Sequence, residues 1–182
     1  MRKYYVRGDG IVDKKVKVKE TLALLLSVGI IVPIWGTFHS LIGIEITWPA
    51  FASSALFFAA NCKIRDSINI AFGHAVGVMW GIMFLSILNF PKFAQYDNRV
   101  VLFITLCILG MLAVFVTNIG FKLLSHLPSL FSGWAIAVGG LGSIPLVNWG
   151  NQPLDIFLST AAGVFIIGGG ISSIQSYLLK KV

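Results

Sequence analysis

The sequence is poor in charge, has only two cysteines and lacks the common catalytic motifs. Charged residues make up 12% of its 182 residues, whereas about 25% is usual in a soluble domain. Cys62 and Cys107 are far apart and have no metal-binding or redox spacing. The chain contains no P-loop, no H-E-x-x-H and no G-x-S-x-G, which argues against ATP hydrolysis and intramembrane catalysis. We therefore expect no enzymatic activity, no catalytic residues, no metal and no cofactor.

Apolar residues dominate instead, at 57% of the chain. Apolar stretches near the length that a bilayer requires recur along the sequence, separated by turns rich in Pro, Gly, Asn and charge. These stretches lack the alternation of barrel strands, so helices are the expected way to satisfy backbone groups in lipid. The sequence predicts an all-α integral membrane protein in a single membrane domain, residues 21–182. Its six transmembrane helices are expected at about 21–44, 48–62, 67–90, 99–121, 127–145 and 154–178.

Basic residues are concentrated at the N-terminus, where seven of the fourteen lie within the first 19 positions. This position, directly before an apolar segment, is typical of a topology signal rather than a nucleic-acid site. With the N-terminus inside, only Lys92 and Arg99 fall outside, so both termini are expected in the cytoplasm. Residues 1–20 are then a cytoplasmic basic segment on the anionic inner leaflet, with docking of a cytoplasmic partner as the alternative.

Two stretches, "TWPAFASSALFFAAN" (47–61) and "HLPSLFSGWAIAVGG" (126–140), predict an internal repeat. When Pro49 is aligned with Pro128, Ser53 meets Ser132, and residues 21–48 lie over residues 100–127. After a seven-residue adjustment, residues 68–78 lie over residues 154–164. Each half has an odd number of spans, so the halves must cross the membrane in opposite senses. We predict inverted three-helix repeats at about 21–90 and 99–178.

The second and fifth segments are short for a membrane span. A helix of about 14 residues rises about 21 Å, against a hydrocarbon core of about 30 Å. Paired short helices in two inverted halves point to a substrate pathway near the midplane, and hydroxyls beside aromatic walls suit a narrow conduit. The alternative is that each of these polar residues only packs or caps helices, and that Trp48 anchors a slightly short helix at the membrane interface. The predicted pathway residues are Ser53, Ser54, Phe57, Asn69, His74, Ser132, Trp134, Asp155 and Thr160.

Glycines recur every four residues in the third segment, at Gly73, Gly77 and Gly81. Such a stripe lets two helices approach closely in lipid. Gly163 continues the pattern in the sixth segment, although Ile167 then interrupts it. We expect these glycines to pack helices, with the third and sixth helices crossing tightly at the repeat axis.

The stretches "WPAFASSALFFAA" (48–60) and "GHAVGVMWG" (73–81), with the six-span pattern, resemble a family of small bacterial inner-membrane proteins known as domain of unknown function 1097. The resemblance covers about residues 20–178 and implies a bacterial inner-membrane location, but no activity.

The residues themselves favour a channel or facilitative transporter for a small neutral or weakly charged solute, because the spans hold no cluster of carboxylates or arginines. Its expected partners are the lipid bilayer, the solute and further copies of the chain in a homo-oligomer, with no nucleic acid. The alternative is a non-transporting scaffold or accessory subunit. Transport predicts a polar stripe on the short helices that is accessible from both sides, whereas a scaffold predicts that packing seals those faces.

Overall fold

The computed structural model describes residues 10–59, 66–119 and 121–181, and the long regular elements in these ranges are all helices. Residues 1–9, residues 60–62 of the second predicted segment, and the bases Lys63 and Arg65 lie outside the described residues. The described part forms six helices, the last in three sections. They are α1 (Gly10–Phe38), α2 (Trp48–Ala59), α3 (Ser67–Leu88), α4 (Asn98–Asn118), α5 (Leu127–Leu141), and α6 (Gln152–Ala162) continued by the π-helical turn η6 (Gly163–Gly168) and α7 (Gly169–Lys181).

Four of these helices are long and apolar enough to cross a membrane: α1, α3, α4 and the sixth helix. The protein is therefore a multi-pass membrane protein, and the predicted all-α class is confirmed. The other two, α2 and α5, are also apolar but have only 12 and 15 residues. Helix α1 begins at Gly10, so the second half of the basic segment is continuous with the first membrane helix.

Local sequence explains where several helices begin. The carboxylate of Asp97 caps α4 by accepting a hydrogen bond from the backbone N–H of Arg99 at 2.7 Å. Pro128 stands in the first turn of α5 and Pro153 in the first turn of α6, where the missing N–H costs no helical hydrogen bond. These three starts mark the ends of the connections that precede α4, α5 and α6.

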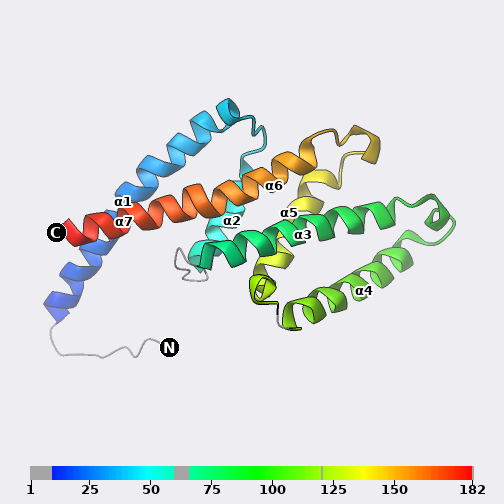
Figure 1. Ribbon diagram of the computed structural model, residues 1–182, viewed down its shortest axis with the longest axis horizontal. Helices are drawn as coiled ribbons and strands as arrows, with labels where there is room; N and C mark the ends of the chain where they lie inside the picture. Colours follow the sequence, from blue (N-terminus) through cyan, green and yellow to red (C-terminus); the bar gives the residue numbers. More distant parts are fainter. Residues whose placement is uncertain (1–9, 60–65, 120, 182) are drawn as a thin grey trace.

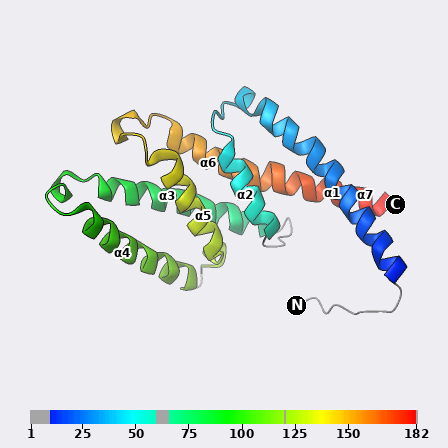
Figure 2. The same ribbon diagram turned by 180° about the vertical axis from the view of Figure 1, so that it is seen from behind.

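The centre of the molecule has two layers. Helix α3 and the sixth helix run side by side in opposite directions (Figure 1). Helices α2 and α5 cross them on one face, which Figure 2 shows in front. Helices α1 and α4 lie at the two ends, α1 beside α7 and α4 beside α3.

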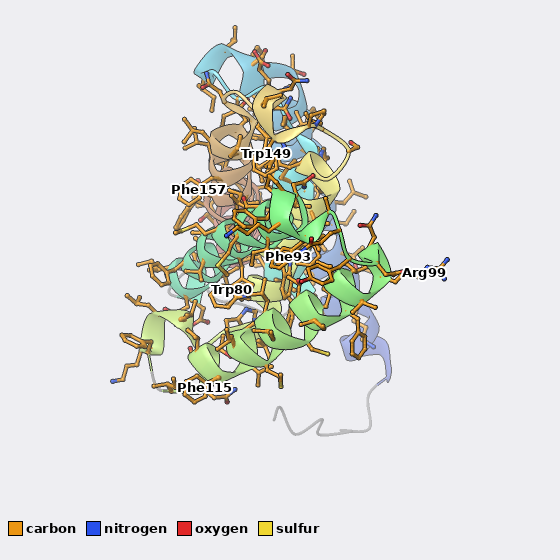
Figure 3. The ribbon with its side chains drawn as sticks, turned by 90° about the vertical axis from the view of Figure 1, so that its right-hand side faces the viewer. Trp80, Phe93, Arg99, Phe115, Trp149 and Phe157 are labelled. Atoms are coloured by element: carbon orange, nitrogen blue, oxygen red, sulfur yellow. The ribbon has the colours of Figure 1, made fainter. Side chains whose placement is uncertain are left out.

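A side-chain hydrogen bond joins the outer helix α4 to α3. The indole Nε1 of Trp80, on α3, donates a hydrogen bond to the carbonyl oxygen of Leu109 at 3.1 Å. In Figure 3, Trp80 lies between α3 and α4, while Arg99 projects away from the helices at the start of α4. Side chains such as Phe103 and Phe115 are about two-thirds exposed, as expected of a surface covered by lipid.

Candidate functional site

The first of two close helix crossings joins α3 to α5 through glycines. A Cβ atom added to Gly77 would overlap the carbonyl oxygen of Leu130, and one added to Gly81 would lie 2.6 Å from the Cβ of Ala137. At Gly73 the same atom would lie 2.7 Å from the Cβ of Ser129. The backbones of α3 and α5 are therefore in direct contact, which only glycine permits at these positions.

The second crossing joins the sixth helix to α2. A Cβ on Gly163 would overlap the carbonyl oxygen of Ala50 and the hydroxyl of Ser53. The Ser159 hydroxyl accepts a hydrogen bond from the backbone N–H of Ala50 at 3.1 Å. The hydroxyl of Ser53 donates to the carbonyl oxygen of Thr160 at 2.8 Å. We expected the glycines of α3 and the sixth helix to face each other, but each set instead faces a short helix.

The π-helical turn η6 explains why Ile167 interrupts the small-residue pattern. A π turn holds one more residue than an α turn, so the residue at the next position on the same face comes one place later. That residue is Gly168, where an added Cβ would lie 2.9 Å from the ring of Phe57. The close face of the sixth helix therefore continues from Gly163 to Gly168.

Between the two crossings, α3 and α6 meet at a buried polar centre. Ile70, one turn before His74, packs with Phe57 and Val164. Val78, one turn after His74, belongs to a different apolar cluster that contains Ile136 and Ile156. His74 of α3 stands midway between Ile70 and Val78, and Thr160 of α6 stands midway between Ile156 and Val164. His74 and Thr160 are fully buried, at 0% and 1% exposed.

The hydrogen bonds of His74 define its tautomer. Its Nδ1 lies 2.9 Å from the carbonyl oxygen of Ile70, and a carbonyl can only accept, so Nδ1 carries the hydrogen. In the neutral ring, Nε2 is then a bare acceptor. It is buried and has no hydrogen-bond partner among the residues that the structure describes. The hydroxyl of Thr160 already donates to the carbonyl oxygen of Phe157 at 2.8 Å.

The other predicted pathway residues occupy several environments. Ser54 is buried and donates to the carbonyl oxygen of Phe51 at 2.9 Å. Trp134 is buried, stacked on Phe131 with ring centroids 6.0 Å apart. Asn69 and Asp155 stand near the starts of two antiparallel helices, so they lie on opposite sides of the centre. The remaining two residues are Phe57, fully buried, and Ser132, half-buried.

Sequence reasoning missed a polar contact at the start of α5. The Nδ1 of His126 lies 2.5 Å from the hydroxyl of Ser129, beside the backbone of Gly73. Burial lowers the pKa of His126 below its ordinary value. His126 itself lies just before the first residue of α5. Its position three residues before a serine, with Pro128 opening the helix between them, is the signal that could have revealed the contact.

A surface groove between α4 and α5 is of a different kind. It has a volume of about 500 Å³ and lies between α4 and α5, lined by side chains such as Leu106, Phe131 and Val138. Its lining is almost entirely apolar, so it does not supply the hydrogen-bonding groups that a polar solute requires.

The fold and the buried polar centre at His74 and Thr160 together define a multi-pass helical membrane protein. Its two short helices, α2 and α5, pack against the two long helices that carry this centre. Residues 25–175 match the family model described as "Protein of unknown function (DUF1097)". The chain belongs to this family, as its sequence stretches predicted. No curated protein and no solved structure matches the chain.

Proposed function

We propose that the protein is a channel or facilitative transporter for a small neutral or weakly charged solute, with a path through the centre framed by α2 and α5. The observation that carries this proposal is the buried Nε2 of His74, which has no partner in the described part of a membrane domain. Ionisable residues in spans are rare and are usually functional. A buried polar atom without a partner also calls for a ligand or water.

The contacts support an architecture of two inverted repeats. In the alignment of the two halves, Pro49 lies over Pro128 and, after the seven-residue adjustment, residues 68–78 lie over residues 154–164. Helix α3 then corresponds to α6 and α5 to α2, so the crossing of α3 with α5 corresponds to the crossing of α6 with α2. The close pair Gly73 and Ser129 then corresponds to Ser159 and Ala50, which are also in contact. In Figure 1, α2 and α5 run in opposite directions, which is what two inverted halves require.

Two apolar clusters also correspond to each other under this alignment. One contains a residue from each of α2, α3 and η6, and the matching residues of α5, α6 and α3 all lie in another. The two sets are Phe57, Ile70 and Val164, and Ile136, Ile156 and Val78. In the proposed repeat, His74 and Thr160 are equivalent positions at the interface of the two halves, the usual place of a substrate site in inverted-repeat transporters.

We also propose a bacterial inner-membrane location with both termini in the cytoplasm. Among the described residues, Lys17 and Lys19 stand near the start of α1, and Lys122 lies on the connection to α5. Lys92 lies on the α3–α4 connection and Arg99 in the first turn of α4, and both would be outside. The positive-inside rule favours this orientation, with residues 1–20 against the inner leaflet. Further copies of the chain would cover part of the exposed apolar surface in a homo-oligomer.

One observation favours the second candidate, a non-transporting scaffold or accessory subunit. The inner face of α2 is closed by packing, since Ser53 is 0% exposed and hydrogen-bonded to the sixth helix. A transporter with this structure must open that contact during its cycle, whereas a scaffold need not.

Stopped-flow light scattering on proteoliposomes tests the proposal. The solutes are urea, glycerol and short amides, with weak acids and amines alongside. The blocking variant is Ser132→Trp, because this side chain is only half-buried and is not among the nearest contacts of the glycines at the close crossings. The matched control is Ser173→Trp, on an exposed face of α7. We expect a solute-selective flux that Ser132→Trp abolishes and Ser173→Trp retains. Flux equal to empty liposomes for every solute would instead support the scaffold.

A further inference from the structure

We propose that Nε2 of His74 accepts a hydrogen bond from the solute, and that the protein therefore takes small neutral molecules with an N–H or O–H donor. Amides, ureas, alcohols and undissociated weak acids belong to this class. The inference deepens the proposed function and rests on it for the passage of the solute, although binding at His74 can be measured without any flux.

Geometry sets the direction of the hydrogen bond. The Ile70 carbonyl, 2.9 Å from Nδ1, holds the ring hydrogen on that nitrogen. A second hydrogen on Nε2 would make a cation, and a fully buried cation without a carboxylate partner is costly. The described residues place no such partner on His74. Nε2 therefore presents a lone pair, which only a donor can satisfy.

The surroundings of His74 do not supply this donor. The Thr160 hydroxyl points its hydrogen at the carbonyl of Phe157, and the Ser53 hydroxyl donates to the carbonyl of Thr160. Gly133 brings only backbone against the His74 backbone. The neighbours one helical turn away, Ile70 and Val78, are apolar. These two hydroxyls donate to backbone carbonyls, and the Nε2 acceptor remains for a bound molecule.

The lone pair of Nε2 also disfavours solutes that lack a hydrogen-bond donor. A simple carboxylate has lost its O–H donor, and its charge would face the Nε2 lone pair inside an apolar shell. An aprotic solute such as dimethyl sulfoxide leaves Nε2 unsatisfied. A site built to hydrogen-bond one partner discriminates strongly against analogues that lack it, because its own polar group then stays unpaired.

Two probes of equal non-hydrogen atom count test the class: acetamide, which has N–H donors, and dimethyl sulfoxide, which has none. The flux of each is measured with wild type, His74→Phe and His74→Gln. Phenylalanine keeps a flat ring without an acceptor, and glutamine restores an acceptor oxygen. Ser86→Ala is the control, because this exposed α3 serine donates only to its own helix. We expect selective acetamide flux in wild type, its loss in His74→Phe and at least partial recovery in His74→Gln.

A second readout does not depend on transport. Nitrogen NMR of ¹⁵N-histidine-labelled protein in micelles, assigned by difference from His74→Gln, reports whether Nε2 carries a hydrogen. The proposal requires an unprotonated Nε2 whose signal shifts with acetamide and not with dimethyl sulfoxide. A protonated Nε2, or equal responses to both probes, overturns it even if flux is observed. An acetamide-specific shift in a protein without flux supports the binding site and refutes the conduit, so the two failures are distinct.

Discussion

Ser53 and Thr160 join the two halves of the chain by a hydrogen bond from a side-chain hydroxyl to a helix carbonyl. The distance is 2.8 Å and both residues are buried. The same hydroxyl lies 3.1 Å from the carbonyl oxygen of Ala50, in its own helix. One serine thus links α2 to the sixth helix at the crossing where Gly163 brings the backbones together.

Ser53→Ala should destabilise the protein because the inter-helix bond is lost. Side-chain hydrogen bonds between membrane helices contribute about 0.6 kcal/mol on average and up to about 1.7 kcal/mol. The measurement is unfolding by SDS in mixed micelles. Ser54→Ala is the matched control, since this neighbour bonds only to Phe51 in its own helix. Equal losses in the two variants would contradict an inter-helix role for Ser53.

Gly77→Ala should separate α3 from α5. Its methyl group would overlap the Leu130 carbonyl, which belongs to the backbone and cannot move alone. Overpacking of this kind costs about 1–3 kcal/mol. At Gly110 on α4 the same methyl meets nothing within 4 Å in the described part of the chain. Gly110→Ala should therefore be neutral or slightly stabilising in the same unfolding assay, and a similar loss there would refute the packing argument.

Trp80→Phe should loosen α4. Phenylalanine keeps most of the apolar contact but cannot donate to the carbonyl of Leu109. A typical hydrogen bond contributes about 0.5–1.5 kcal/mol. We expect faster hydrogen exchange in α4, measured by mass spectrometry, with little change in α2. Trp149→Phe removes a bond within the α5–α6 connection and should leave α4 unchanged. Unchanged exchange in α4 of Trp80→Phe would show that apolar packing alone holds this helix.

His126 should make stability depend on pH. Burial lowers its pKa in the folded protein below the ordinary value of 6.5. Between the folded and unfolded pKa values the unfolded chain binds more protons, so stability falls as pH drops through about 6.5. The check is the apparent melting temperature in detergent against pH, for wild type and His126→Gln. The variant should lose this part of the slope; identical slopes would contradict the assignment.

Deleting Ile166, an exposed residue of η6, should be tolerated. One residue fewer converts the π turn into an α turn and keeps the flanking faces in register, so the glycine now at 168 still meets Phe57. Deleting Ile104, an exposed residue of the regular helix α4, rotates everything that follows it. We expect folded protein by size-exclusion chromatography for the first deletion and not for the second. The opposite order would contradict the extra-residue interpretation of η6.

The sequence predicted the helices and their order well, because apolar length and turn chemistry are local properties. It also singled out the glycines. It did not predict which helices these glycines contact, because a stripe of small residues indicates close approach to a neighbouring helix but does not identify that helix. The π turn could not be predicted either. One extra residue in a continuous apolar segment leaves no signal in the sequence, so Ile167 was interpreted as a break in the small-residue pattern. Similarly, the contact between His126 and Ser129 required the actual start of α5.

The shortness of α2 and α5 has a consequence for the bilayer itself. A 12-residue helix rises about 18 Å, well below a hydrocarbon core of about 30 Å. Lipid beside such a helix must thin, at a cost for every ångström of mismatch. When two copies of the chain share one thinned region, the boundary of deformed lipid around them is shorter than around two separate copies, so the total free-energy cost of thinning is lower. Bilayer thickness would then influence assembly directly, with thick membranes drawing protomers together and thin ones letting them disperse.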